Sequence, residues 1–362
     1  MSSVDDSQRT QSGAALPGRR RASAWRPLRS SPEGLLHPSL TILVLIAVLA
    51  LVALVALWAG AQTITLAQLR TDELSRTVFF RLRLPRVVMA ALIGASLALV
   101  GAALQALFRN PLADPSTLGV SGGGAVGAAT AIAFGWAARV SGVPMVFLAA
   151  FCGAIAAVVV VHKIARTGPV MLPGALLLAG VVVNLIASAA VLTIQYMTDS
   201  ERALQILRWL IGSLDVVGFD TIWRMLIFLV PCWIALLFFS RDLHLLAMGE
   251  ETAGALGVNV ARCEWAIHLI SSLLVGVTVA VGGAIAFVGL IVPHAVRLLF
   301  GQDLRIVLPG SLLLGAAFLI AADASARVVL SPIELPVGAV TGLLGGPVFL
   351  WLLYRRQRYS AL

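Results

Sequence analysis

Two motifs in one glycine-rich stretch contain residue types that could do chemistry. Gly119-Val-Ser121-Gly-Gly123 has the spacing of a nucleophile elbow, in which a serine hydroxyl attacks a carbonyl after a histidine takes its proton. His268 or His294 would have to supply the imidazole from another segment of the chain. An intramembrane hydrolase with Ser121 as nucleophile is therefore one alternative, although a helix start made of small residues produces the same letters.

The second motif, Gly122-x-Gly124-x-x-Gly127, has the spacing of a dinucleotide-binding fingerprint. That fingerprint needs a preceding strand and a following acidic residue, and the surrounding sequence predicts neither. A Walker A loop is excluded as well, because the only lysine, Lys163, follows His162 rather than glycine. The chain cannot bind ATP through such a loop, so an ATP-driven process would need a separate motor subunit.

Charged residues in the apolar part of the chain lie close to the ends of the apolar segments. An ion-coupled carrier, the second alternative, normally holds an ionisable residue at mid-membrane, and the centres of the predicted spans have none. Asp323 comes nearest, and its spacing from Arg327 predicts an ion pair across one helical turn. Arg83 and Arg86 either anchor a helix at the membrane surface or receive carboxylates from a soluble protein.

Uncharged polar residues inside the apolar segments either line a path or hold helices together. They are Gln105, Asn184, Gln195, Thr278 and His268. We favour helix bridging, because a polar group surrounded by lipid is stabilised by a hydrogen bond to a neighbouring helix.

The composition indicates which elements must position these residues. Hydrophobic residues make up 59% of the chain and charged residues 12%, against about 25% charged in a soluble domain. Nine stretches contain no Asp, Glu, Lys or Arg and are long enough, or nearly so, to cross a bilayer core, which takes roughly 17–25 residues. They are 40–58, 87–108, 118–138, 143–161, 170–198, 225–240, 265–296, 306–322 and 335–354.

The stretch 265–296 is too long for a single crossing. Gly282-Gly283 and Pro293 disfavour a continuous helix there, and they predict a full span over 264–287 followed by a short helix over 288–300. We therefore predict an all-α integral membrane protein with about ten transmembrane helices.

An even number of crossings returns both termini to one side, and both are basic, so the positive-inside rule predicts that both are cytoplasmic. Residues 1–38 are expected to be a disordered basic tail, 39–355 one membrane domain and 356–362 a short cytoplasmic tail of a multi-pass protein in the cell (inner) membrane. The net charge of +9 is explained by arginines that meet membrane lipids, so no nucleic-acid partner is predicted. No metal site or cofactor is predicted, because the three cysteines lack paired spacing: Cys152, Cys232 and Cys263.

Two segments outside the spans predict short helices. The segment 198–221 mixes charged residues with Trp209 and predicts a helix at the outer surface. The segment 247–258, on the predicted cytoplasmic side, predicts an amphipathic helix that ends near a glycine. A soluble partner could dock on this second helix.

Longer motifs follow one another between about residues 65 and 355. They are Arg83-Leu-Pro-Arg86, Leu104-Gln-Ala-Leu-Phe-Arg-Asn-Pro-Leu-Ala-Asp-Pro-Ser-Thr-Leu-Gly-Val-Ser121, Trp209-Leu-Ile-Gly-Ser213, Gly249-Glu-Glu-Thr-Ala-Gly-Ala-Leu-Gly257, Phe287-Val-Gly-Leu-Ile-Val-Pro-His-Ala-Val-Arg297, and Glu334-Leu-Pro-Val-Gly338 with Gly346-Pro-Val-Phe-Leu-Trp351. In this order the chain resembles the FecCD family of ABC importer permeases.

The resemblance implies a subunit of an ATP-driven importer with type II architecture. Two permease subunits of ten helices each, identical or paralogous, would work with an ABC ATPase dimer and an extracytoplasmic substrate-binding (lipo)protein. The expected activity is uptake of ferric siderophores by alternating access, with haem or cobalamin as alternative cargoes. The chain itself is expected not to be an enzyme, since ATP hydrolysis resides in the partner subunit.

The resemblance also implies which residues act at each face. The helix between the sixth and seventh spans would contact the ATPase through Gly249, Glu250, Ala253, Leu256 and Gly257. The arginines expected to meet glutamates of the binding protein are Arg83, Arg86 and Arg327. The Asn110-Pro-Leu112 turn matches the first cytoplasmic gate of the family. The second gate is polar in some members, but residues 170–174 read Val-Met-Leu-Pro-Gly here, so this gate stays unassigned.

Overall fold

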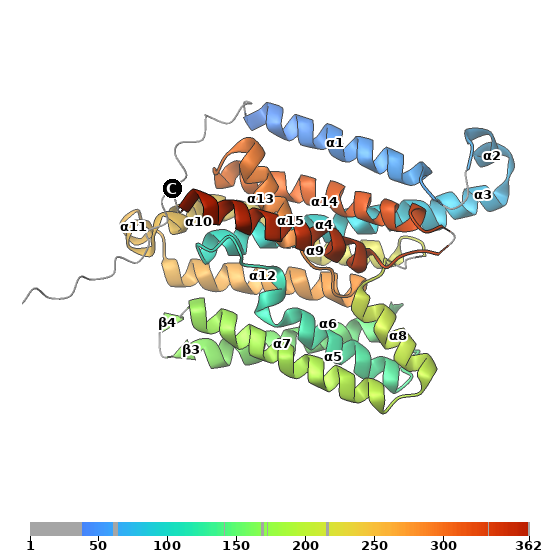
Figure 1. Ribbon diagram of the computed structural model, residues 1–362, viewed down its shortest axis with the longest axis horizontal. Helices are drawn as coiled ribbons and strands as arrows, with labels where there is room; N and C mark the ends of the chain where they lie inside the picture. The colour runs from blue at the N-terminus through green and yellow to red at the C-terminus, as the bar shows by residue number, and fades with distance from the viewer. Residues whose placement is uncertain are drawn as a thin grey trace, which may run out of the picture. The chain divides into compact units, whose positions relative to one another are not determined.

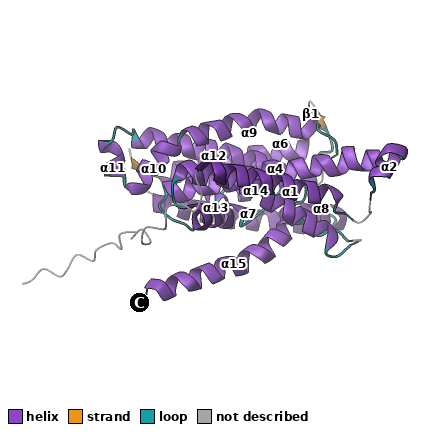
Figure 2. Cartoon of the chain, turned by 90° about the horizontal axis from the view of Figure 1, so that it is seen from above, coloured by secondary structure: helices purple, strands orange, loops and turns teal. Residues whose placement is uncertain are grey.

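The computed structural model describes residues 38–60, 64–140, 142–167, 170–171, 173–214, 217–331 and 333–360. The expected N-terminal tail lies outside these ranges apart from Pro38, and so do the last two residues of the expected C-terminal tail. Helices dominate the described chain (Figure 2), and its strands form two short antiparallel hairpins: β1 Arg139–Val140 with β2 Val143–Pro144, and β3 Arg166–Thr167 with β4 Val170–Met171. The all-α prediction is confirmed.

Ten helices of the described chain correspond to the predicted spans. Seven are long and apolar enough to cross a bilayer: α1 Pro38–Trp58, α4 Leu84–Leu107, α6 Met145–Ala165, α7 Pro173–Tyr196, α9 Asp220–Phe238, α12 Val260–Gly282 and α14 Leu304–Val328. Three are apolar over a shorter length: α5 Val120–Ala133, α13 Val288–Phe300 and α15 Val337–Ser360. The remaining helical elements are α2 Leu66–Thr71, α3 Glu73–Thr77, the π-helix η1 Val78–Arg83, the 3-10 helix η2 Pro115–Leu118, α8 Ser200–Ile211, α10 Ser240–Met248 and α11 Glu250–Ala255.

The predicted break after α12 is present. The helix ends at Gly282, because Gly283 has a φ of 71° and turns the chain out of the helical path. A Cβ on Gly283 would also lie 2.3 Å from the carbonyl oxygen of Trp209 in α8, so this turn has no room for a side chain. α13 has the predicted bounds, whereas the span before it covers 260–282 instead of 264–287.

α4 lies at the centre of one group of helices, with α12, α13 and α14 packed against it (Figure 1). Glycines allow this close packing, because a Cβ on Gly101 would lie 2.0 Å from the carbonyl oxygen of Gly289 in α13. In the same way, a Cβ on Gly94 would lie 2.2 Å from the carbonyl oxygen of Gly315 in α14. The backbones of α4, α13 and α14 therefore touch directly.

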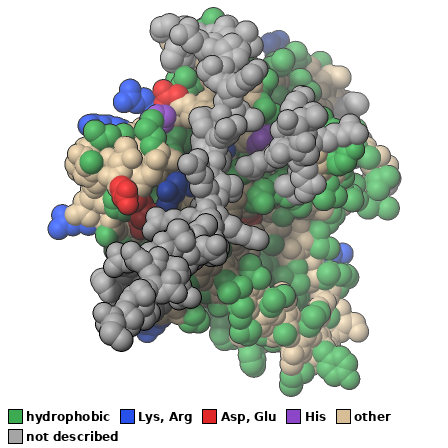
Figure 3. All heavy atoms as spheres, turned by 60° about the vertical axis from the view of Figure 1, so that its left-hand side comes forward, with side chains coloured by type: hydrophobic (Ala, Val, Ile, Leu, Met, Phe, Trp, Pro, Cys, Tyr) green, Lys and Arg blue, Asp and Glu red, His purple; other side chains and the backbone are tan. Residues whose placement is uncertain are grey.

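The other helices surround this group. α5 packs against both α6 and α7, and α1 runs beside α14 (Figure 1). α15 runs at an angle away from most of the other helices (Figure 2). Figure 3 shows charged side chains gathered on one part of the displayed face, with hydrophobic side chains covering much of the remainder. Such an apolar surface suits contact with lipid or with another membrane subunit.

The two ends of the helices carry different elements. α10, α11 and the β3–β4 hairpin lie at one end, called here the α11 end, and α2, α3 and α8 lie at the other, called the α8 end (Figure 1). α1 begins at the α11 end and α15 finishes there. The described chain therefore returns to the end at which it started, as an even number of crossings requires.

The short helices predicted outside the spans have different outcomes. α8 lies inside 198–221, as predicted. The helix predicted over 247–258 is present with narrower bounds, because α10 continues to Met248, α11 begins only at Glu250, and α11 ends at Ala255. Between them Gly249 has a φ of 133°, which is incompatible with a continuous helix.

Candidate functional site

The hydrolase geometry is not formed. Ser121 lies at the start of α5, and among the described residues it makes no hydrogen bond to a histidine. His268 instead packs against two rings, with its centroid 5.2 Å from that of Phe108 and 5.7 Å from that of His162. The nucleophile and its base are therefore not brought together.

The uncharged polar residues mainly bridge helices, which confirms that interpretation. Gln105 of α4 donates to the carbonyl of Gly289 at 3.0 Å and accepts a hydrogen bond from Arg297, both in α13. Asn184 of α7 donates to the carbonyl of Ser116 at 2.9 Å, and its side-chain oxygen accepts from the amide of Gly122 at 3.0 Å. These bonds satisfy polar groups that would otherwise face lipid.

Gln195 and Thr278 make different contacts. Gln195 of α7 donates to the carbonyl of Ala203 in α8 at 3.2 Å, so it also joins two helices. The Thr278 hydroxyl donates to the carbonyl of Val275, so its hydrogen bond is made within α12 and joins no other helix. Bridging is thus the role of three of the residues that we singled out.

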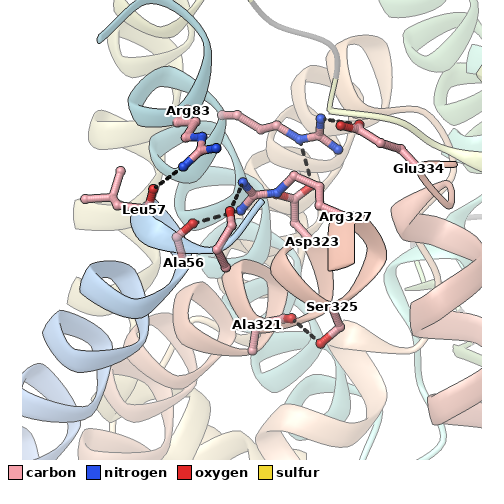
Figure 4. Close-up of polar contacts among 10 residues, drawn as sticks. Ala56, Leu57, Arg83, Ala321, Asp323, Ser325, Arg327 and Glu334 are labelled. Carbon is pink, nitrogen blue, oxygen red and sulfur yellow. Dashed lines mark hydrogen bonds and ion pairs between the residues drawn. The ribbon is translucent and has the colours of Figure 1, made fainter. Parts of the chain in front are cut away.

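An ion-pair cluster lies at the α8 end (Figure 4). Arg86 of α4 bonds through Nε to Asp323 at 2.9 Å and through Nη1 to Glu334 at 2.7 Å. Arg327 lies 3.0 Å from the other carboxylate oxygen of Asp323, as the i+4 spacing predicted. Asp323 is 1% exposed and so depends on these two arginines for its charge balance.

Arg327 of this cluster and the nearby Arg83 cap the C-terminus of α1. Arg327 donates to the carbonyls of Ala59 at 2.9 Å and Ala56 at 3.1 Å, and Arg83 donates to the carbonyl of Leu57 at 3.4 Å (Figure 4). The last carbonyls of a helix have no partner within it and carry a partial negative charge, so cationic donors stabilise them.

The hydrogen bonds to α1 limit the solvent exposure of the arginines that were expected to meet the binding protein. Arg83 and Arg327 are buried, with 7% and 4% of the residue exposed. Arg86 is the most exposed of the three, with 17% of its side chain accessible. In this structure Arg83 and Arg327 are therefore occupied by α1, and a protein arriving at the α8 end would reach Arg86 first.

The expected gate turn lies at the α11 end, directly after α4. The amide of Leu112 donates to the side-chain oxygen of Asn110 at 3.0 Å, and the amide of Ala113 donates to the Asn110 carbonyl at 3.1 Å. Asn110 therefore closes a turn through its own side chain, as asparagine commonly does. Leu112 is left exposed at 43%.

Asp114, which the sequence analysis did not single out, caps the start of η2, the element that follows this turn. Asp114 is buried, and its carboxylate accepts hydrogen bonds from the amide and hydroxyl of Ser116 at the start of η2. Burial raises the pKa of the Asp114 carboxyl above its usual value, and the hydrogen bonds from Ser116 offset only part of this rise. The Asp-Pro-Ser order was the signal, since Asp before Pro is a favoured start for a helical turn.

The expected second gate falls on residues whose side chains lie outside the described part of the chain. Within it, Val170–Met171 form β4 of the β3–β4 hairpin at the α11 end (Figure 1), and Pro173–Gly174 begin α7. It stays unassigned.

The residues expected to contact an ATPase surround α11. Gly249 and Gly257 flank it with φ values of 133° and 88°, so both act as turns. Ala253 is fully buried and packs α11 against the rest of the chain, whereas Leu256 is 57% exposed. Glu250 is half-exposed and forms an ion pair with Arg109 at 2.7 Å. An outward-facing turn with Leu256 thus follows α11, and Glu250 connects the helix through Arg109 to the loop after α4.

These observations define a class of protein: a polytopic helical membrane protein whose ion pairs lie at the two ends and whose interior polar groups hold helices together. The chain belongs to the FecCD transport family, whose model matches residues 40–355.

Relatives and a solved structure agree with this family. The chain is 38% identical to the hemin transport system permease protein HmuU of Yersinia pestis, over 91% of this chain and 98% of that protein. It is 38% identical to the vitamin B12 import system permease protein BtuC of Klebsiella pneumoniae, over 88% of this chain and 93% of that protein. A structure described as an inward-facing conformation of a metal-chelate type ABC transporter matches with a TM-score of 0.79 at 33% identity, over 88% of this chain and 100% of that chain.

The chain is therefore a multi-pass permease subunit of a type II ABC importer, and not an enzyme. The predicted resemblance and fold class are confirmed. The ion-coupled carrier and the serine hydrolase are both overturned, because a permease subunit of an ABC importer is neither a secondary carrier nor an enzyme.

Proposed function

We propose that the chain forms half of the membrane pathway for a metal chelate, with ferric siderophores as the first candidate cargo and haem and cobalamin as the alternatives. The observation that carries this proposal is that the names of its relatives and of the matching structure refer to hemin, vitamin B12 and metal chelates, all bulky metal complexes. A wall with few charges suits such cargo, because a strongly binding site would slow its release.

In this proposal the chain works with a second permease subunit, an ABC ATPase dimer and an extracytoplasmic binding protein. The α11 end, with both termini, faces the cytoplasm, and the ATPase contacts α11 and its flanking turns through Gly249, Glu250, Leu256 and Gly257. Ala253, which was expected among these contacts, is buried and supports the helix from within the chain. The Asn110–Leu112 turn closes the pathway on the same side. Alternating access follows when nucleotide-driven motion of the ATPase reaches that turn.

The α8 end would receive the binding protein. Arg86 supports this role, because it is partly exposed and its planar guanidinium is suited to a carboxylate. Arg83 and Arg327 would contribute less directly, by holding α1 in place beside it.

The cargo is tested by ATP-dependent uptake into proteoliposomes that contain the chain and its ATPase, with the binding protein supplied outside. Radiolabelled ferric siderophores, hemin and cyanocobalamin are compared at equal concentration. Uptake of one of them at least tenfold above a vesicle with a hydrolysis-deficient ATPase identifies the cargo. No ATP-dependent uptake of any of them would reject the proposal.

The ATPase contact is tested with a matched pair of exposed leucines. Leu256→Asp, in the turn after α11, should reduce co-purification of the ATPase, whereas Leu66→Asp, in α2 at the opposite end, should leave it intact; the two leucines are 57% and 69% exposed. Equal co-purification of both variants would remove the coupling role of α11.

Binding-protein capture on nanodiscs tests Arg86 in the same manner. Arg86→Glu should weaken capture, while Arg81→Glu, an exposed arginine in η1, should not. Unchanged capture by the Arg86 variant would leave that residue only its ion pairs within the chain.

A further inference from the structure

Arg109 occupies a backbone position that normally belongs to glycine. The amide of Asn110 donates to the carbonyl of Gln105 at 3.1 Å, and the amide of Arg109 donates to the carbonyl of Ala106 at 3.2 Å. This pair of bonds is the Schellman pattern that ends a helix, and its first residue past the cap adopts left-handed backbone geometry. Arg109 accordingly has a φ of 51°, which is unfavourable for a residue with a Cβ.

The side chain of Arg109 connects two parts that are distant in the sequence. Its Nη2 lies 2.7 Å from Oε1 of Glu250, the first residue of α11. Both side chains are about half-exposed, at 44% and 50%, and an exposed ion pair adds little to folding stability. Stability therefore does not account for an arginine in a position where glycine would be unstrained.

We propose that Arg109 is a positioning residue that makes the Asn110–Leu112 turn follow α11, through its ion pair with Glu250. The inference rests on the proposed role of α11 in contacting the ATPase. The Asn110–Leu112 turn begins at the residue directly after Arg109. A displacement of the Arg109 guanidinium therefore acts on the first backbone bond of that turn. From this left-handed position the side chain of Arg109 reaches Glu250 of α11.

The competing explanation is that Glu250 bonds directly to a cation of the ATPase and that its contact with Arg109 is incidental. The two accounts differ in what happens when the charges are exchanged. If the pair within the chain matters, the exchange of Arg109 and Glu250 restores it. If Glu250 bonds to a cation of the ATPase instead, the exchange leaves that cation facing an arginine.

The experiment monitors the turn in the complete complex of chain, second subunit and ATPase. Leu112→Cys, in a background with Cys152, Cys232 and Cys263 replaced by serine, is labelled with a membrane-impermeant maleimide, without nucleotide and with ATP and vanadate. The parent should change its labelling rate at least fivefold on addition of nucleotide. Arg109→Glu and Glu250→Arg should each abolish the change, and the double exchange should restore at least half of it.

Two further variants distinguish a loss of coupling between α11 and the Asn110–Leu112 turn from a loss of folding. Arg109→Gly relieves the left-handed strain, so it should keep or raise the midpoint of thermal unfolding while abolishing the nucleotide-dependent change in labelling. Glu251→Arg, the exposed neighbour in α11, should behave as the parent.

The inference is overturned if Arg109→Glu or Arg109→Gly responds to nucleotide as the parent does, or if the double exchange fails to restore the response. Loss of ATPase binding in Glu250→Arg and in the double exchange, with a normal response in Arg109→Glu, would assign Glu250 to the ATPase and leave the proposed function standing. A parent complex that binds no ATPase would instead remove the proposed function, and the inference with it.

Discussion

Replacement of Arg327 by methionine tests whether the α8-end cluster holds the bundle together. The change removes two hydrogen bonds to the carbonyls of Ala59 and Ala56 and the ion pair with buried Asp323. Loss of one partner from a buried ion pair typically costs about 3–5 kcal/mol. Because Arg86 still neutralises Asp323, we take the lower end, and we expect a loss of about 3 kcal/mol.

The assay is thermal unfolding of purified protein in one detergent at one scan rate. For a chain of this length, about 3 kcal/mol corresponds to a fall of roughly 4 °C in the midpoint. Arg83→Met should cause a smaller fall, because its bond to the Leu57 carbonyl is longer, at 3.4 Å. Arg81→Met, in the same π-helix but exposed, is the matched control and should stay within about 0.5 kcal/mol.

A double variant examines the cause of the loss. Asp323→Asn removes the buried charge, so in combination with Arg327→Met it should lower the midpoint by less than the sum of the two single effects. Equal midpoints for Arg327→Met and Arg81→Met would refute the cap. Strict additivity in the double variant would refute the coupling of Asp323 to Arg327.

Two further predictions concern packing and docking. Gly101→Ala should reduce the folded fraction in fluorescence-detected size-exclusion chromatography, with overpacking of about 1–3 kcal/mol, because its Cβ would lie 2.0 Å from the Gly289 carbonyl oxygen. Gly342→Ala, with no atom within 4 Å of its Cβ, should be neutral, and a normal Gly101→Ala profile would contradict the direct contact of α4 with α13. Glu334→Ala should strengthen capture of the binding protein severalfold, because it removes the carboxylate bonded to the Nη1 of Arg86 without touching buried Asp323. Unchanged or weaker capture would mean that Glu334 does not compete for that arginine.

The sequence alone determined the features that depend on neighbouring residues. Span positions follow from local hydropathy, since a segment that cannot hydrogen-bond to lipid must satisfy its own backbone as a helix. The break between α12 and α13 follows from Gly282-Gly283, and the Asn110 turn from a side chain that bonds two residues along. The pair of Asp323 with Arg327 follows from one turn of helix. The break at Gly249 was missed, because a single glycine does not by itself say whether a helix continues through it.

Only the tertiary structure decided which of these elements meet. Arg86 pairs with residues 237 and 248 positions away, and Arg109 pairs with a residue 141 positions away. No periodicity in a sequence relates residues at such separations, because they come together only when whole helices pack. The same packing turned Arg83 and Arg327 from surface arginines into caps of α1, since the carbonyls that they bond belong to a helix end placed beside them by the fold.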